Sequence, residues 1–180
     1  YTDSYSQIES FEFADGTIKT SGDYFNSTLT MKVSGKYSDP DDYAKGTTII
    51  IGSEETDEIH GNGRTDIIYG GKGTDKLYGE SGNDELHGDT GNDELYGGNG
   101  DDTYVFNLGD GNDVIDENSR NGKDKVVFGE GIKAEDVKVT RDGNDMVLVV
   151  GSEGDTLRIT SQYTDSYSQI ESFEFADGTI

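Results

Sequence analysis

The sequence predicts an all-β protein built as a parallel β-solenoid, in which the chain winds through flattened coils of two short strands each. Three observations support this fold class. Six nine-residue repeats follow one another without a break, glycine supplies 26 of the 180 residues, and only 30% of the residues are hydrophobic. So few apolar side chains cannot fill a thick core and offset the entropy of ordering the backbone. A thin core repeated from coil to coil is therefore expected.

The nine-residue repeat begins at Gly52 and runs to Val105. Its copies read GSEETDEIH, GNGRTDIIY, GGKGTDKLY, GESGNDELH, GDTGNDELY and GGNGDDTYV. Glycine fills the first position of every copy, aspartate the sixth, and an apolar residue or tyrosine the eighth. A seventh, imperfect copy, LGDGNDVID, follows two inserted residues later and places Asp113 and Ile115 at the matching positions.

Each nonapeptide divides into a turn of six residues and a strand of three. Because side chains alternate along a strand, only the eighth residue of each copy faces inward. Two nonapeptides then complete one coil, so odd and even copies stack in opposite sheets. The predicted inward stacks are Ile59, Leu77, Leu95 and Ile115 in one sheet, and Ile68, Leu86 and Tyr104 in the other.

The turns concentrate oxygen atoms. Glycine-rich corners expose backbone carbonyls, and the sixth-position aspartates add one carboxylate to each turn. Ligation by oxygen alone is what a hard cation such as calcium prefers. The formal charge of −24, from 38 acidic and 14 basic residues, also favours cations and disfavours nucleic acid or anionic lipid as partners.

These repeats match the pattern GGxGxDxUx and resemble the RTX (repeats-in-toxin) haemolysin-type calcium-binding family. Residues 124–180 read as a series of strands and resemble the haemolysin-type calcium-binding related region that follows such blocks. The segments VTRDGNDMVLVV, GDTLRIT and IESFEFADGT carry that second resemblance. Together they imply a calcium-bound parallel β-roll with a flanking antiparallel β cap.

The resemblance further implies that each calcium ion lies between two turns one full coil apart. The candidate aspartate pairs are Asp57/Asp75, Asp75/Asp93, Asp93/Asp113, Asp66/Asp84 and Asp84/Asp102, which gives up to about five internal ions. The predicted metal ligands are Asp57, Asp66, Gly70, Gly71, Gly73, Asp75, Gly79, Gly82, Asp84, Gly88, Gly91, Asp93, Gly97, Gly98, Gly100, Asp102 and Asp113.

The copies are unequal at the fourth position. Copies three to six have glycine there, whereas copy one has Glu55 and copy two has Arg64. An unusual backbone angle at this position costs a residue with a side chain more than it costs glycine. We therefore expect the best calcium sites around copies three to six.

Two other kinds of site are disfavoured. The glycine-rich turns contain no GxxxxGK[ST] sequence, so they are not predicted to bind phosphate. The ninth positions place His60 with Tyr78 and Tyr96 on one outer face, and Tyr69 with His87 on the other. We predict that these rings form an outer aromatic ladder rather than a catalytic or zinc site, because no convergent partners accompany the histidines.

A longer repeat sets the domain organisation. Residues 1–18 recur unchanged as residues 163–180, which favours a natural tandem array over an engineered duplication. We assign residues 1–18 to the end of a preceding unit, 19–50 to N-terminal flanking strands, 51–117 to the roll and 118–180 to a capping region. The cap is expected to nucleate folding, with Phe173 and Phe175 packed against the final coil.

No catalytic constellation is found, so we predict a module that is not an enzyme. The resemblance implies export through a type I secretion machinery, then folding on calcium at a secreted or cell-surface location. Calcium and neighbouring repeat units of the same chain are the expected partners, and no segment is apolar enough to insert in a membrane. Two kinds of full-length protein could contain this module. The long repeat favours a repeated extension unit of a large, adhesin-like protein; the alternative is the calcium-dependent folding region of an RTX toxin or secreted hydrolase.

Overall fold

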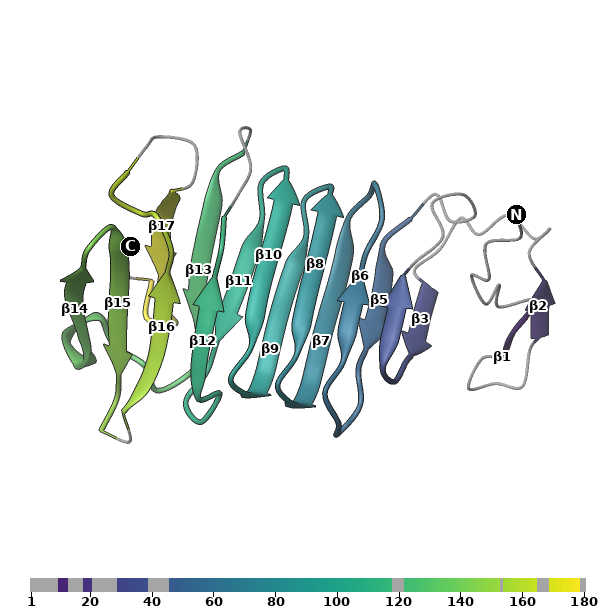
Figure 1. Cartoon of the computed structure of the whole chain (residues 1–180), viewed down its shortest axis with the longest axis horizontal. Coiled ribbons are helices and arrows are strands. Elements are labelled where there is room, and N and C mark those ends of the chain that lie inside the picture. The colour runs from purple at the N-terminus through teal and green to yellow at the C-terminus, as the bar shows by residue number, and fades with distance from the viewer. Residues whose placement is uncertain are drawn as a thin grey trace.

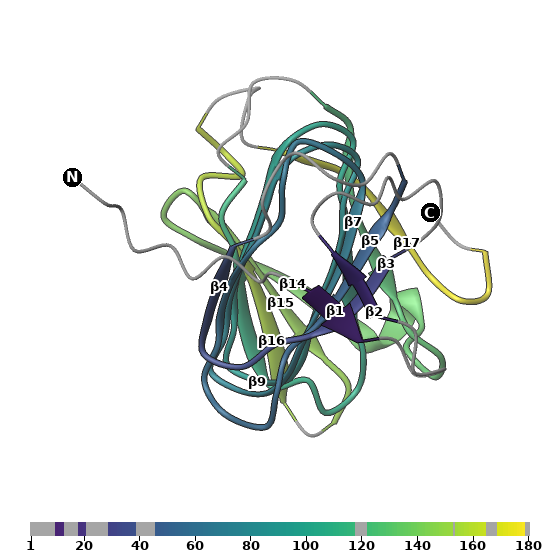
Figure 2. The same cartoon turned by 90° about the vertical axis from the view of Figure 1, so that its right-hand side faces the viewer.

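The computed structural model describes residues 10–12, 18–20, 29–38, 46–117, 122–152, 154–164 and 169–178. Within these residues the strands wind along one axis as an elongated parallel β-solenoid (Figure 1). Viewed along that axis, successive coils superpose as a flattened loop (Figure 2). The predicted fold class is confirmed. None of the described residues forms a helix long and apolar enough to cross a membrane.

Successive strands of the roll alternate between two facing sheets, and each pairs in parallel with the strand one coil away. In the described residues the seven-stranded sheet contains β3 (Leu29–Lys32), β5 (Thr48–Ile51), β7 (Asp66–Gly73), β9 (Glu85–Gly91), β11 (Thr103–Phe106), β13 (Asp124–Phe128) and β17 (Ile170–Glu174). The eight-stranded sheet of the same residues contains β4 (Lys36–Ser38), β6 (Glu58–His60), β8 (Lys76–Ser81), β10 (Glu94–Asn99), β12 (Asn112–Ile115), β16 (Asp155–Ile159), β15 (Asp145–Val150) and β14 (Val137–Asp142).

The strand registers confirm both predicted inward stacks. In the eight-stranded sheet Leu77 lies between Ile59 and Leu95, and in the seven-stranded sheet Leu86 lies between Ile68 and Tyr104. Every one of these side chains is at most 2% exposed. Each eighth position therefore contributes one large side chain from its sheet, and β11 adds a second, Phe106, so the core is a double row of side chains along the axis.

Parallel pairing runs past residues 51–117 at both ends. Ile50 of β5 extends the stack below Ile68, and Val126 of β13 extends it above Tyr104. Ile159 of β16 lies beside Ile115 in the same way. These residues are buried and keep the alternation of the nonapeptide strands, so the flanks form further coils without the full repeat sequence.

The C-terminal region both continues the roll and covers the end of one sheet. After β13 a short 3-10 helix, Ala134–Asp136, leads into the antiparallel hairpin of β14 and β15, and β15 pairs antiparallel with β16. Strands β16 and β17 instead pair in parallel with β12 and β13. The Phe175 ring stacks on Phe128 at 4.7 Å between centroids, and Phe173 packs against the core, as predicted.

Little of the segment assigned to a preceding unit is described. Residues 10–12 form β1 (Ser10–Glu12), which pairs antiparallel with β2 (Ile18–Thr20). The remainder of residues 1–18 lies outside the described residues, and so does the prediction made for it.

Candidate calcium-binding turns

The predicted ligands all lie where strands begin or end. Each sixth-position aspartate stands directly before a strand or within its first two residues, and the glycines follow at the far ends of the strands and in the turns. Because strands of successive coils are in register, equivalent turns stack above one another at the two edges of the roll. The aspartates of one edge therefore form a continuous row.

Hydrogen bonds join the aspartates of each row. The backbone N–H of each sixth-position aspartate donates to Oδ1 of the aspartate one coil further along. On one edge the N–O distances are 2.7 Å for Asp57 to Asp75, 2.8 Å for Asp75 to Asp93 and 3.0 Å for Asp93 to Asp113. On the other edge they are 2.8 Å for Asp66 to Asp84 and for Asp84 to Asp102. The structure thus brings together all five predicted aspartate pairs, which we call the aspartate ladders.

The second carboxylate oxygen divides the copies into two groups. In copies three to six Oδ2 is buried and accepts no hydrogen bond from any described residue; these oxygens belong to Asp75, Asp84, Asp93 and Asp102. A buried polar atom left in this state costs about 1–3 kcal/mol, and more when it is charged. Four such atoms in successive turns favour the binding of a proton or a cation.

In copies three and four a backbone carbonyl faces the same small space as the unpaired oxygen, and in copy six the Tyr104 hydroxyl does so instead. A methyl group placed on Gly79 would lie 2.5 Å from Asp84 Oδ2 and 2.6 Å from the carbonyl oxygen of Gly97, one coil further along. At Gly70 the corresponding distances are both 2.7 Å, to Asp75 Oδ2 and to the Gly88 carbonyl. Glycine at the first position therefore leaves open a space bounded by a carboxylate oxygen and a carbonyl oxygen.

The turns of copies three to six need left-handed backbone angles. At the fourth position φ is 132° for Gly73, 139° for Gly82 and 134° for Gly100, which confirms the expected unusual angle in copies three, four and six; Gly91 of copy five is outside the left-handed region. The second position is also left-handed, including at two residues with side chains, Glu80 at 75° and Asp89 at 60°. Such angles are costly outside glycine, so these two turns hold their shape against local strain.

Burial disfavours the charged form of these carboxylates. It raises the pKa of Asp84 to about 8 and that of Asp93 to about 7, and the charge of neighbouring aspartates adds to the effect. Burial likewise raises the pKa of Asp75 and of Asp102 to about 6. Stacked carboxylates in a buried row repel one another, and a bound cation removes that repulsion.

Copies one and two satisfy their carboxylates with their own donors. Asp57 Oδ2 accepts the backbone N–H of Ser53 at 2.7 Å and its hydroxyl at 2.8 Å. Asp66 Oδ2 accepts the N–H of Asn62 at 2.8 Å. The backbone angles at the second and fourth positions of both copies are outside the left-handed region. We call these two turns closed and those of copies three to six open.

Comparison with protein families matches the repeats to a known sequence pattern. Residues 51–86 and 78–115 match the RTX calcium-binding nonapeptide repeat, and residues 145–180 match the haemolysin-type calcium binding protein related domain. This chain is an RTX calcium-binding repeat module. No curated protein matches the chain. RTX repeats bind calcium and are typical of secreted proteins.

The open turns of the RTX module fit calcium. They offer carboxylate oxygens together with carbonyl oxygens or, in copy six, the Tyr104 hydroxyl, and the buried Oδ2 atoms accept no hydrogen bond from any described residue. Calcium takes six to eight oxygen ligands at 2.3–2.6 Å, from carboxylates and carbonyls alike. When bound, the ion supplies the positive charge that the buried carboxylates lack.

The ladder of the RTX module continues beyond the predicted ligands. Asp124 Oδ1 accepts the N–H of Asp102 at 2.8 Å, and Glu171 Oε2 accepts the N–H of Asp124 at 2.7 Å. The signal for Asp124 was present in the sequence, because Gly122 and Val126 stand in the fourth and eighth positions relative to it. The turn of this copy is two residues longer than in a regular nonapeptide. Because the nine-residue spacing is broken there, the sequence pattern did not reveal the copy.

The outer aromatic ladders of the RTX module are confirmed. The Tyr78 ring stacks on His60 at 4.2 Å and on Tyr96 at 4.6 Å, and Tyr69 stacks on His87 at 4.3 Å. These contacts join neighbouring strands on the outside of each sheet, opposite the inward stacks.

Proposed function

We propose that this module folds when it binds calcium outside the cell and serves as a repeated structural extension unit of a large secreted or surface protein. It acts as a spacer and not as an enzyme. The observation that carries the proposal is the row of buried, unpaired carboxylate oxygens in the four open turns. A roll with these atoms buried and without a cation is costly, so folding and calcium binding are one process.

Charge and composition support the same coupling. The chain carries a formal charge of −24, and its core is limited to one or two side chains in each strand. Self-repulsion on this scale opposes compaction, and the thin core gives little to offset it. Divalent ions bound along both ladders neutralise the repulsion where it is strongest.

The ligands that we propose come from the open turns. Each ion lies between turns one coil apart and takes carboxylate oxygens from the ladder aspartates and carbonyl oxygens from the first and fourth positions. The closed turns of copies one and two are proposed to contribute less, because protein donors already hold Asp57 and Asp66. Residues 145–180, which match the haemolysin-type calcium binding protein related domain, add the final coil of the roll.

Calcium dependence suits an exported chain. Extracellular calcium modules have dissociation constants of about 10⁻⁴–10⁻³ M, well above the free calcium inside a cell. The chain therefore stays extended before export, passes a type I secretion machinery, and folds outside. The recurrence of residues 1–18 as 163–180 supports the further proposal that such units are arrayed in tandem as a spacer.

The test is a calcium titration of the chain followed by far-ultraviolet circular dichroism, with magnesium as the control cation. We expect a cooperative change from coil to β signal with calcium alone. The variant D84N should need more calcium, whereas D136N, at an exposed aspartate outside the ladders, should match the wild type. A chain that is fully folded in chelator would overturn the coupling of folding to calcium.

A further inference from the structure

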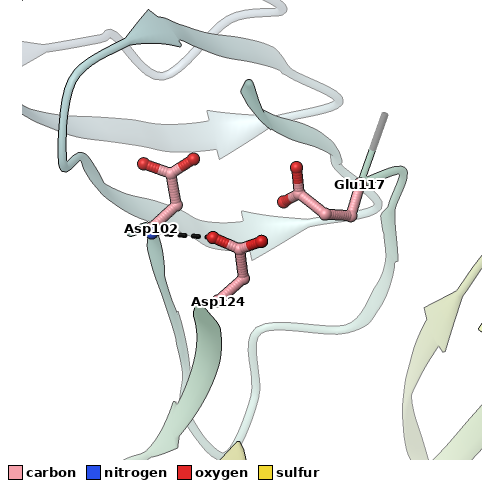
Figure 3. Close-up of side chains that lie close together, drawn as sticks. All are labelled: Asp102, Glu117 and Asp124. Carbon is pink, nitrogen blue, oxygen red and sulfur yellow. Dashed lines mark hydrogen bonds between the residues drawn. The ribbon is translucent and has the colours of Figure 1, made fainter. Parts of the chain in front are cut away.

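A group of three buried carboxylates lies at the end of one aspartate ladder. Asp102 and Glu117 are 0% exposed and Asp124 is 3% exposed. One carboxylate oxygen from each lies within 4.8 Å of the others. Figure 3 shows the three side chains, which come from three separate stretches of chain, facing a common space. Neither Glu117 nor Asp124 belongs to the six regular nonapeptides.

Glu117 stands where a regular repeat has its first glycine. Leu95 is in register with Ile115, so the strand register places Gly97 opposite Glu117 one coil further along. Residues 117–126 therefore form a degenerate eighth copy, with Glu117 first, Gly122 fourth, Asp124 sixth and Val126 eighth. In this copy the first position carries a carboxylate instead of a hydrogen atom.

A side chain at the first position points at the carboxylate of its own turn. A methyl group on Gly88 would lie 2.6 Å from Asp93 Oδ2, and one on Gly79 2.5 Å from Asp84 Oδ2. This direction leads into the space that the open turns keep for a cation. Glu117 follows it and brings its carboxylate to Asp124 of the same copy and Asp102 of the preceding coil.

Hydrogen bonds hold the group in this arrangement. The Tyr104 hydroxyl donates to Glu117 Oε2 and accepts the backbone N–H of Gly97, with an N–O distance of 2.7 Å. Asp124 Oδ1 accepts the N–H of Asp102. Asp102 Oδ2 is buried and receives no hydrogen bond from any described residue. The group is thus oriented by the protein, while one of its oxygens lacks a partner.

We propose that Asp102, Glu117 and Asp124 bind one further calcium ion, more tightly than the regular turns do. A regular site shares two ladder carboxylates, whereas this one collects three, and calcium affinity rises with the number of charged ligands. Three buried carboxylates without a cation would repel one another strongly. The ion would join the start of β11 to the start of β13 and to Glu117, which follows β12, where the regular repeats end.

This inference rests on the proposed function, since it assumes that calcium is the ion of the regular turns. Calcium binding by the whole chain is counted by equilibrium dialysis for the wild type and for E117Q. The variant keeps the size of the side chain and an oxygen that accepts from Tyr104. The matched control is E130Q, at an exposed glutamate outside the ladders.

We expect E117Q to lose one bound ion, the tightest, and to need roughly tenfold more calcium for the first binding step. E130Q should behave as the wild type. Equal ion counts and equal first affinities for E117Q and the wild type would overturn the proposed site and leave the regular sites standing. A wild type that binds no calcium would instead overturn both this inference and the proposed function.

Terbium luminescence gives a second measurement that does not depend on how well E117Q folds. Terbium replaces calcium at oxygen sites and emits when a tyrosine close to it is excited. Because the Tyr104 hydroxyl contacts Glu117, the first terbium ion bound should be sensitised by Tyr104. We expect Y104F to lose the emission of the first ion and Y78F, in the outer ladder, to keep it. Unchanged emission of the first ion in Y104F would overturn the site.

Discussion

The closed turns of copies one and two and the open turns of copies three to six share the same aspartate, the same ladder hydrogen bond and the same inward residue. They differ in the backbone of the second position. Where it is left-handed, as at Gly71, Glu80, Asp89 and Gly98, the carboxylate keeps one unpaired oxygen. Where it is not, as at Ser53, its N–H satisfies that oxygen.

The comparison shows that an aspartate in the sixth position is not sufficient for a calcium site. The backbone angle of the second position separates the two groups, at Glu80 and Asp89 as well as at glycine, because φ sets the direction in which each N–H points. A closed turn satisfies with protein donors the oxygen that an open turn leaves unpaired, and we propose that it adds little calcium dependence.

The largest difference should appear when one aspartate of each kind is changed. D84N removes a charged ligand shared by two aspartate pairs, so it should lose at least one ion and raise the calcium midpoint of folding by about tenfold or more. D57N removes a hydrogen-bond acceptor in a closed turn and should destabilise the fold by ~1 kcal/mol while the ion count stays unchanged. Dialysis and chemical unfolding at saturating calcium measure both. Equal losses of ions in the two variants would contradict the distinction between open and closed turns.

A smaller effect is expected from opening a closed turn. The double variant N62G/R64G gives copy two glycine at its second and fourth positions, which allows the left-handed angles found in copy three. We expect this variant to bind one ion more than the wild type, as counted by dialysis. Its folding should also depend more steeply on the calcium concentration. N62A/R64A removes the same side chains without freeing the backbone and serves as the control. A count that stays at the wild-type value in both variants would show that glycine does not govern the opening.

The smallest effect concerns strain within an open turn. Glu80 has φ of 75°, where glycine carries no penalty, so E80G should stabilise the calcium-bound roll by ~1 kcal/mol. The ion pair of Glu80 with His60 is exposed, and its loss offsets little of this gain. E80A removes the same carboxylate but keeps the strain. Thermal unfolding in excess calcium should rank E80G above E80A; the reverse order would show that the side chain and not the backbone angle matters.

Much of the roll could be predicted because the repeat has a fixed phase. The eighth-position side chains, such as Leu77 and Tyr104, must face inward once nine residues make a turn and a strand. The aspartate pairs follow from the same phase. Copies one and two were expected to be the weaker sites because other residues replace glycine at their second and fourth positions. The unusual backbone angle was expected at the fourth position, whereas the hydrogen bonds of Ser53 and Asn62 involve the second.

The C-terminal strands and the role of Glu117 could not be predicted, because neither follows the nine-residue spacing of the repeat. Strands β16 and β17 join the roll through parallel pairing with β12 and β13, and pairing between distant segments leaves no period in the sequence. Glu117 was overlooked because it occupies a position defined by glycine, in a copy whose turn is two residues longer. In both cases the edge of the existing sheet, rather than local sequence, selects the partner.

The stacking of coils has a mechanical consequence. Each coil contacts only its two neighbours, and the hydrogen bonds between coils run along the axis that separates β3 from β17 (Figure 1). A force that pulls the two ends apart loads the interfaces between coils in series. The solenoid should therefore unfold one coil after another from an end, instead of in a single step. The work needed to release each coil is set by its turns, and the concentration of calcium would change it.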